Sequence, residues 1–150
     1  MKYQEEKYGQ VRSEIEVLFK EHWQEIALNQ DKIKLNPDFD TYKTLNDAGI
    51  LRIFTARQDG LLVGYFLVMV TPHIHYKDHS FAMNDIIYVH PKWRGATVAY
   101  RMIKHVENAL KEDGVSVLII NMKTHSPFDR LLEGLKFTNT ERLYSKYIGE

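Results

Sequence analysis

Two early segments of the chain carry apolar residues at helical spacing. In Val11–Ala27, apolar side chains recur every three or four positions with Glu and Lys between them, the pattern of an amphipathic helix. Asp38–Ala48 carries a shorter stripe and ends before Gly49, a residue type that commonly terminates helices. We therefore predict two helices, separated by a break around Pro37.

Strand-like segments follow. Ile50–Arg57 and Leu61–Thr71 are rich in β-branched, aromatic and other apolar residues and flank Asp59-Gly60, which predicts a hairpin because glycine tolerates the positive φ of a tight turn. Phe81–Val89 predicts a third strand, and the polar, histidine-rich Pro72–Ser80 before it predicts a loop.

The second half of the chain predicts a helix at Thr97–Lys111 and a strand at Val115–Met122, whose nearly unbroken apolar run is typical of a strand buried on both faces. Ser126 is the expected cap of a short helix at Phe128–Leu135, and Arg142–Ile148 is the expected final strand. Strands joined through a helix run parallel. The expected fold is α+β with three layers: a mixed, mostly antiparallel sheet, a central parallel pair, and helices on both faces.

Composition narrows the class of protein. The 150 residues, 44% of them apolar, suit one domain over residues 1–150. Twenty basic residues balance twenty acidic ones, which argues against broad attraction to nucleic acid or anionic membranes. No cysteine is present, so disulfides and thiolate nucleophiles are excluded. The longest apolar stretch is shorter than the roughly 20 residues of a membrane span, and no signal peptide is apparent, so we expect a cytoplasmic protein.

The segment Asp85–Tyr100 carries the candidate chemistry. It predicts a strand, a tight loop of mostly small residues, and the start of a helix. The first N–H groups of a helix lack backbone partners and attract anions, so small residues there predict a phosphate-binding site. A closely packed strand–helix turn that binds nothing is the alternative. The segment has neither Gly-Lys-Ser/Thr nor three spaced glycines, so it is not a P-loop or a dinucleotide motif.

Residues 91–99 also resemble a known motif. Arg94-Gly95-Ala96-Thr97-Val98-Ala99, after Pro91 and the strand, resembles the acetyl-CoA-binding motif Gln/Arg-x-x-Gly-x-Gly/Ala of the GNAT N-acetyltransferase superfamily. Thr97 departs from it, because glycine is usual there. The whole pattern is also similar to small GNAT proteins carried by bacteriophages, notably at His22–Ala27, Pro72–Tyr76 and Lys123–Phe137.

The resemblance implies a binding site for acetyl-CoA. Backbone N–H groups at the helix start would hold the pyrophosphate, and the strand edge would pair with the pantetheine amides. The neighbouring parallel strand would splay away, and polar residues at its end would face the gap. The implied cofactor-binding residues are Ile87, Tyr88, Val89, Arg94, Gly95, Ala96, Thr97, Val98, Ala99, Asn121 and Ser126.

Acetyl transfer to an amine needs a base for the amine and an acid for the leaving thiolate. Many GNAT enzymes place an acidic base where Asp85 stands. The alternative for this residue is a charge satisfied at the sheet surface or paired with an arginine. The tyrosine that usually acts as the acid is absent, and Leu132 occupies its expected place. His125 and Tyr144 are the substitute candidates.

The resemblance predicts an enzyme that transfers acetyl from acetyl-CoA to a primary amine of a small molecule or protein, by direct attack in a ternary complex. The alternatives are an inactive GNAT-fold module that binds acyl-CoA or a partner, and a nucleic-acid-associated protein using the basic residues near Arg94.

No metal site is predicted, because the histidines of 73–79 lack a carboxylate framework. These histidines and His22–Glu25 are expected to border the acceptor site, where Glu25 would attract a cationic amine. The alternative is that Trp23 is a core residue and Glu25 a surface residue. A final strand exposed at a sheet edge is compatible with a homodimer, and a phage-encoded protein would act in the host cytoplasm.

Overall fold

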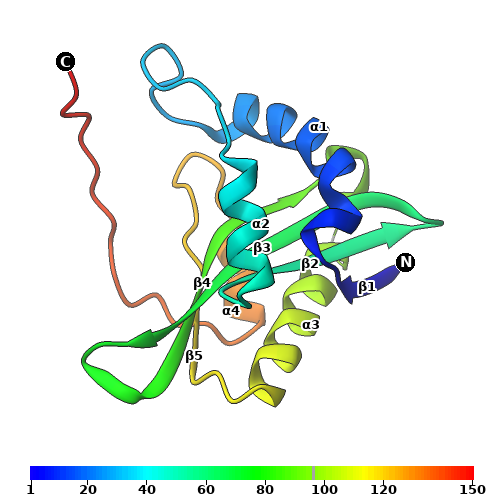
Figure 1. Ribbon diagram of the computed structural model, residues 1–150, viewed down its shortest axis with the longest axis vertical. Helices are drawn as coiled ribbons and strands as arrows, with labels where there is room; N and C mark the ends of the chain where they lie inside the picture. The colour runs from blue at the N-terminus through cyan, green and yellow to red at the C-terminus, as the bar shows by residue number, and fades with distance from the viewer. Residues whose placement is uncertain (96) are drawn as a thin grey trace.

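The computed structural model describes residues 1–95 and 97–150 (Figure 1). The strands are β1 (Lys2–Glu5), β2 (Leu51–Gln58), β3 (Leu61–His73), β4 (Tyr76–Val89) and β5 (Val117–Ile119). The helices are α1 (Tyr8–Ile26), α2 (Phe39–Asp47), the short 3-10 helix η1 (Pro91–Trp93), α3 (Val98–Glu112) and α4 (Asp129–Gly134). The predicted helices are confirmed, with ends shifted by a few residues.

The strands form one sheet in the order β1-β2-β3-β4-β5. The first four strands pair antiparallel and β4 pairs parallel with β5, which confirms the predicted mixed sheet with one parallel pair. The turn between β2 and β3 uses Asp59 at φ 51° and Gly60 at φ 86°. These two left-handed residues match the twist of a two-residue hairpin, so the hairpin prediction is also confirmed.

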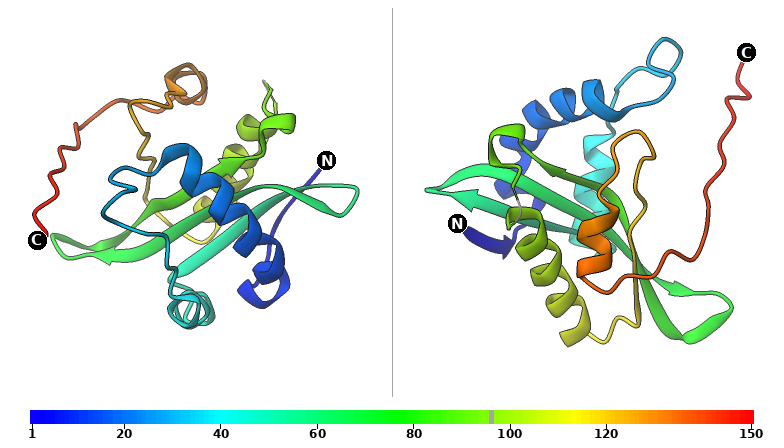
Figure 2. Two further views of the ribbon diagram at one scale, coloured as in Figure 1. Left: turned by 90° about the horizontal axis from the view of Figure 1, so that it is seen from above. Right: turned by 180° about the vertical axis from the view of Figure 1, so that it is seen from behind.

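Helices cover both faces of the sheet (Figure 2). On one face, α1 and α2 bury an aromatic-rich cluster that includes Phe19, Tyr65 and Tyr88. On the other face, α3 and the region of α4 cover a second cluster that includes Phe66 and Met102. Alternation along the strands sends successive side chains into these two clusters, and the predicted three layers are confirmed.

A β-bulge interrupts the pairing of β3 with β4. Leu67 pairs with Ile86, and the next residue, Val68, pairs with Asn84. Asp85 is therefore the extra residue on β4, with no partner directly opposite. A bulge of this kind bends a strand and redirects a side chain, and it lies close to the C-terminal end of β4 at Val89.

The parallel pairing of β4 and β5 stops at Met83 and Ile119. One residue further on, the side chain of Asn84 takes the place of a backbone partner. Its Oδ1 accepts the N–H of Asn121 at 2.6 Å, and its Nδ2 donates to the Asn121 carbonyl at 3.2 Å. Beyond this bond the two strands separate, so the C-terminal part of β4 has a free edge.

The predicted loop at Pro72–Ser80 is wrong. Strands β3 and β4 continue through most of it and form a protruding hairpin (Figure 1). The His73 ring packs on the rings of Tyr76 and Phe81, with centroid separations of 4.8 and 4.4 Å. Cross-strand aromatic pairs stabilise a hairpin, and a count of polar residues does not detect them.

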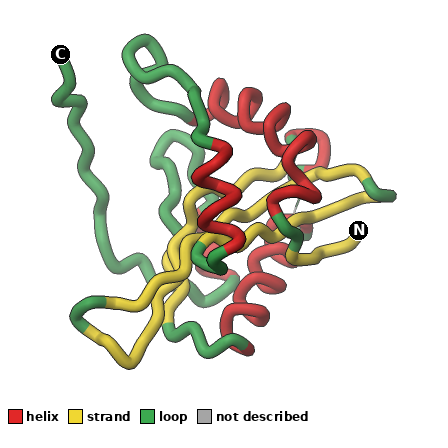
Figure 3. The backbone as a smooth tube through the Cα atoms, viewed as in Figure 1, coloured by secondary structure: helices red, strands yellow, loops and turns green. Residues whose placement is uncertain are grey.

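The predicted final strand at Arg142–Ile148 is also wrong. The chain after Leu135 has no regular secondary structure, and Figure 3 shows this end of the chain as a loop that leaves the body. Leu143, Tyr144 and Ile148 are more than four-fifths exposed. Strand propensity alone does not order a segment, because a strand needs a partner edge.

Three smaller corrections concern the ends of elements. Strand β1 was not predicted, and it pairs with β2 from Lys2 opposite Arg57 to Glu5 opposite Phe54. Strand β5 is much shorter than predicted, and Val117 is exposed rather than buried because β5 lies at the sheet edge. Helix α4 starts after Phe128, not at a Ser126 cap.

Candidate active site

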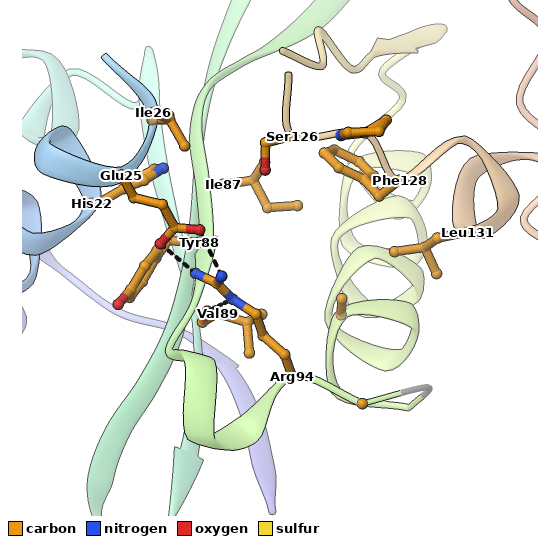
Figure 4. A pocket seen from close by; sticks show the side chains of 13 residues that line it. His22, Glu25, Ile26, Ile87, Tyr88, Val89, Arg94, Ser126, Phe128 and Leu131 are labelled. Carbon is orange, nitrogen blue, oxygen red and sulfur yellow. Dashed lines mark hydrogen bonds and ion pairs between the residues drawn. The ribbon is translucent and has the colours of Figure 1, made fainter. Parts of the chain in front are cut away.

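The separation of β4 from β5 is accompanied by a cavity of about 260 Å³ (Figure 4). Its walls come from the C-terminal end of α1, the end of β4, the loop that leads to α3, and the segment around the start of α4. The lining residues are His22, Glu25, Ile26, Ile87, Tyr88, Val89, Arg94, Gly95, Ala99, Ser126, Pro127, Phe128 and Leu131.

The N-terminus of α3 borders this cavity. Thr97 occupies the N-cap position without a side-chain capping bond, and the first turn contains no acidic residue. A Cβ atom added to Gly95 would meet no described atom within 4 Å, so the space above this backbone is open. The early N–H groups of α3 are therefore available to an anion, and the helix dipole favours negative charge there.

Arg94 and Glu25 form an ion pair across the rim of the cavity. The Arg94 Nη1 and Nη2 atoms each lie 2.6 Å from a different Glu25 oxygen, a two-pronged geometry that suits a guanidinium and a carboxylate. This hydrogen bonding lowers the pKa of Glu25 below its usual value and outweighs the opposing effect of burial. The pair joins the end of α1 to the loop before α3.

The third nitrogen of the Arg94 guanidinium also has a partner. Its Nε donates to the Val89 carbonyl at 2.7 Å, and the guanidinium lies over the Tyr88 ring at 5.6 Å. All three guanidinium nitrogens thus donate to protein oxygens, and the charge is compensated by Glu25. The Val89 carbonyl, at the end of the free β4 edge, is engaged as well.

His22 forms part of the α1 wall. Its side chain is 5% exposed and packs on Tyr88 with ring centroids 4.8 Å apart. The Nδ1 atom lies 3.0 Å from the Tyr65 hydroxyl. Burial lowers the pKa of His22 to about 4, with Glu25 acting in the opposite direction and Arg94 in the same direction. The imidazole is therefore neutral at pH 7.

Asp85 lies in the bulge of β4 and faces α2. Its Oδ2 accepts a hydrogen bond from the Tyr42 hydroxyl at 3.2 Å. Desolvation by the surrounding protein raises the pKa of Asp85, and the bond from Tyr42 partly opposes that rise. A raised carboxyl pKa makes a stronger base than an ordinary aspartate, which is the property that general base catalysis needs.

The structure brings most of the predicted cofactor-binding residues together. Seven of them line the cavity: Ile87, Tyr88, Val89, Arg94, Gly95, Ala99 and Ser126. Thr97 and Val98 lie at the start of α3, beside these residues. Ala96 lies outside the described residues.

Other predicted residues lie away from the cavity lining. Asn121 has its backbone engaged by Asn84, and its side chain is exposed. His125 is exposed in the loop after β5. Tyr144 is 85% exposed in the C-terminal segment. Asp85 precedes the lining residues of β4 by two positions.

Several residues that line the cavity were not predicted from the sequence. Ile26, Phe128 and Leu131 supply apolar wall to the cavity, and each fits an ordinary helix or core pattern in the sequence. His22 and Glu25 were expected near an acceptor, but their contacts with Tyr65 and Arg94 join elements 43 and 69 residues apart in the chain. No local pattern marks such pairs.

The histidines of the β3–β4 hairpin serve packing and polar contacts. His73 stacks within the hairpin, and the Nδ1 atom of His79 lies 2.8 Å from the Ser116 hydroxyl oxygen. Among the residues that the structure describes, no group of three or more His, Cys, Asp or Glu side chains is arranged to hold a metal ion. Within the same described ranges, no helix has the length and apolar character needed to cross a membrane.

Comparison with protein families agrees with this architecture. The model of the acetyltransferase (GNAT) family matches residues 13–131, which include most of α1, the residues that line the cavity and the start of α4. The chain belongs to the acetyltransferase (GNAT) family, and its class of activity is N-acyl transfer. No curated protein sequence matches the chain.

Solved structures share the fold at low sequence identity. A ribosomal-protein-alanine N-acetyltransferase from Brucella melitensis biovar Abortus 2308 has a TM-score of 0.74 and 22% identity, with 99% of each chain covered. An aminoglycoside acetyltransferase from an uncultured soil metagenomic sample, in complex with sisomicin, has a TM-score of 0.77 and 14% identity, covering 99% of this chain and 95% of that one. A predicted acetyltransferase with acetyl-CoA from Clostridium acetobutylicum has a TM-score of 0.72 and 13% identity, covering 98% and 96%.

Proposed function

We propose that this protein transfers an acetyl group from acetyl-CoA to a primary amine. The observation that carries the proposal is the continuity of the cavity between β4 and α4 with the open N-terminus of α3. A ligand with an anionic end and a long, narrow, amide-bearing arm fits both parts. Its phosphates would lie at α3, and its arm would lie along the free edge of β4.

Different residues of the site would bind different parts of acetyl-CoA. Backbone N–H groups of residues 95 and 97–99 would hold the pyrophosphate, because the side chain of the N-cap residue Thr97 makes no capping bond to the start of α3. The β4 backbone at Ile87 and Tyr88 would pair with the pantetheine amides, and Ser126 would add a hydroxyl from the opposite wall. Apolar side chains at Ile26 and Phe128 would exclude water from the arm.

Asp85 is the proposed base. The amine nitrogen would attack the thioester carbonyl carbon, the carbon–sulfur bond would break, and the sulfur would leave as a thiolate that takes up a proton. Asp85 would accept the proton that the amine loses, through a water molecule. His125 and Tyr144 remain the proposed sources of the proton for sulfur. The sequence has no cysteine to carry the acyl group, which supports direct attack in a ternary complex.

The acceptor is proposed as an amine of a small molecule or a protein. The relatives with the same fold are named for a protein alanine in one case and were solved with sisomicin in another. The carboxylate of Asp85 lies on the face of β4 covered by α2, so a cationic amine would approach from the side of α1 and α2.

Calorimetry with acetyl-CoA tests this function first. We expect saturable binding to the parent protein and its loss in Gly95→Glu, which places an anion in the open space at α3. Gly9→Glu is the matched control, because Gly9 also has no described atom within 4 Å of an added Cβ but is remote in the sequence, on α1. A panel of amines is then screened for release of free CoA. The absence of binding at millimolar acetyl-CoA would contradict the proposal.

The second candidate is an acyl-CoA-binding module without turnover. The observation that favours it is that neither His125 nor Tyr144 lines the cavity. The two candidates agree on acetyl-CoA binding and differ in chemistry. Release of CoA that depends on an added amine supports the enzyme, whereas tight binding without release for any amine supports the module.

A further inference from the structure

The buried imidazole of His22 has one engaged nitrogen and one unengaged nitrogen. Its Nδ1 contacts the Tyr65 hydroxyl at 3.0 Å. Its Nε2 has no hydrogen-bond partner among residues 1–95 and 97–150. Buried polar groups are normally hydrogen-bonded, so a side chain that is 5% exposed with an unused nitrogen requires an explanation.

Tyr65 determines which nitrogen carries the proton. Its side chain is fully buried, and within the described part of the chain its hydroxyl has no other hydrogen-bond partner. A buried hydroxyl loses free energy if its proton has no acceptor, so the Tyr65 O–H donates to Nδ1. The neutral ring then carries its single proton on Nε2. The ionisable groups that act on His22 are Glu25 and Arg94, and these already neutralise each other in an ion pair.

The Nε2 atom reaches the cavity. His22 is a lining residue, and Figure 4 shows its ring on the α1 wall beside Glu25 and Ile26. Among the described residues, the Tyr8 hydroxyl is a side-chain group that has no partner and is also sealed from solvent. His22 Nε2 differs, because it has no partner but is accessible. Because it has no partner and is not sealed, the Nε2–H group is open to the cavity.

We propose that His22 binds the acyl donor, with its Nε2–H donating a hydrogen bond to a carbonyl oxygen of the acylated pantetheine arm. Tyr65 acts as a positioning residue that fixes the tautomer. A neutral imidazole donor suits an uncharged carbonyl, whereas a charged donor in this apolar wall would carry a desolvation cost. The proposal rests on the proposed function, because it assigns a residue to the same ligand.

Nitrogen NMR of isotope-labelled histidine tests the tautomer in the free protein. We expect the His22 signals of a ring protonated at Nε2, and a change of the Nε2 signal on addition of acetyl-CoA. In Tyr65→Phe the donor to Nδ1 is removed, and we expect a mixture of tautomers. A ring protonated at Nδ1 in the parent would overturn the inference even where calorimetry shows that acetyl-CoA binds.

Two substitutions at His22 test the hydrogen bond itself. His22→Gln keeps an N–H donor, and we expect it to retain most of the affinity for acetyl-CoA. His22→Leu removes the donor, and we expect affinity to fall about tenfold, the effect of one uncharged hydrogen bond. Equal affinity of a folded His22→Leu variant and the parent would overturn the inference. If His22→Leu does not fold, an Nε2 signal unmoved by saturating acetyl-CoA overturns it instead.

These outcomes separate the inference from the function on which it rests. Failure of the parent to bind acetyl-CoA in calorimetry overturns both. Binding that Gly95→Glu abolishes, together with an Nε2 signal that does not respond, overturns only the role of His22.

Discussion

Glu25 and Arg94 lie 69 residues apart in the sequence and meet through two hydrogen bonds of 2.6 Å each. The position of Arg94 in the loop before α3 suggests a cation for phosphates, yet its charge is already matched by a carboxylate. An incoming phosphate would therefore compete with Glu25 for the same guanidinium. This competition makes the affinity for an anionic ligand depend on a residue of α1.

Glu25→Gln is expected to strengthen acetyl-CoA binding several-fold. The change removes the competing negative charge and leaves the Arg94 guanidinium available to phosphate oxygens. Calorimetry at low and high salt measures the effect, which should shrink as salt screens the charges. Glu21→Gln, one turn earlier on α1, is the matched control and should not change affinity. Weaker binding by Glu25→Gln would instead show that the ion pair holds Arg94 in its binding position.

Asp85→Asn is expected to lower kcat by about 10²- to 10⁴-fold, the usual effect of losing a general base. Acetyl-CoA affinity should not change. Because the pKa of Asp85 is raised in the folded protein, its ionised form costs stability at neutral pH, so the variant should melt at the same or a higher temperature. Lower activity together with a lower melting temperature would indicate misfolding rather than loss of a base.

Tyr42→Phe is expected to shift the pH profile of Asp85-dependent turnover. The base works when deprotonated, so the rate falls as pH falls through the Asp85 pKa. The bond from Tyr42 lowers that pKa, and its removal should move the acidic limb to higher pH. Initial rates at saturating acetyl-CoA across about pH 4 to 8 measure the shift. This range begins near the ordinary carboxyl pKa of about 4 and extends upward because the pKa of Asp85 is raised. An unmoved limb would exclude Asp85 as the titrating group.

The sequence predicted the parts of this fold that depend on local patterns. The Asp59-Gly60 hairpin, the stripe of α3 and the parallel pair follow from turn chemistry, helical spacing and chain connectivity. The loop before α3 was predictable because its mostly small residues interrupt the apolar patterns on either side. Its use as an anion-binding site stays a prediction.

The remainder depends on tertiary contacts. The Arg94–Glu25 pair and the Tyr65–His22 bond join distant segments, so neither leaves a local signature. The Arg142–Ile148 segment shows the opposite case, in which a local pattern predicts a strand that does not form. A strand needs a neighbouring strand edge with which to pair. The bulge at Asp85 follows from the register of two strands and is not visible in either strand alone.

The free energy of unfolding is expected to fall as pH is lowered from 6.5 toward about 4, the ordinary and native pKa values of His22. Because the pKa of His22 is lower in the native state, the unfolded chain takes up a proton at a higher pH than the native protein does. This proton uptake stabilises the unfolded state and lowers the free energy of unfolding. The slope contributed by one histidine reaches about 1.4 kcal/mol per pH unit. Urea melts of the parent and His22→Gln measure it, because the variant lacks this contribution. Parallel pH curves for the two proteins would contradict the assignment.

Removal of residues 139–150 is expected to change the free energy of unfolding by less than about 0.5 kcal/mol, as for exposed surface positions. The deletion removes the Tyr147 ring, which the Lys32 Nζ atom approaches to 4.7 Å from the ring centroid. Phe137, which packs against the core, is kept. The same truncated protein tests Tyr144 as the acid: abolished turnover with intact acetyl-CoA binding would assign the proton to the removed segment, and unchanged turnover would exclude Tyr144.

The bond between the Asn84 side chain and the Asn121 backbone has a consequence for how this architecture can diversify. The two hydrogen bonds of this amide side chain lie within the sheet, at the place where the two strands part, and involve no surface loop. Loops such as residues 27–38 can therefore change in length and chemistry without closing the cavity. A fold built this way can vary its surface segments while a single asparagine keeps its place between the two strands.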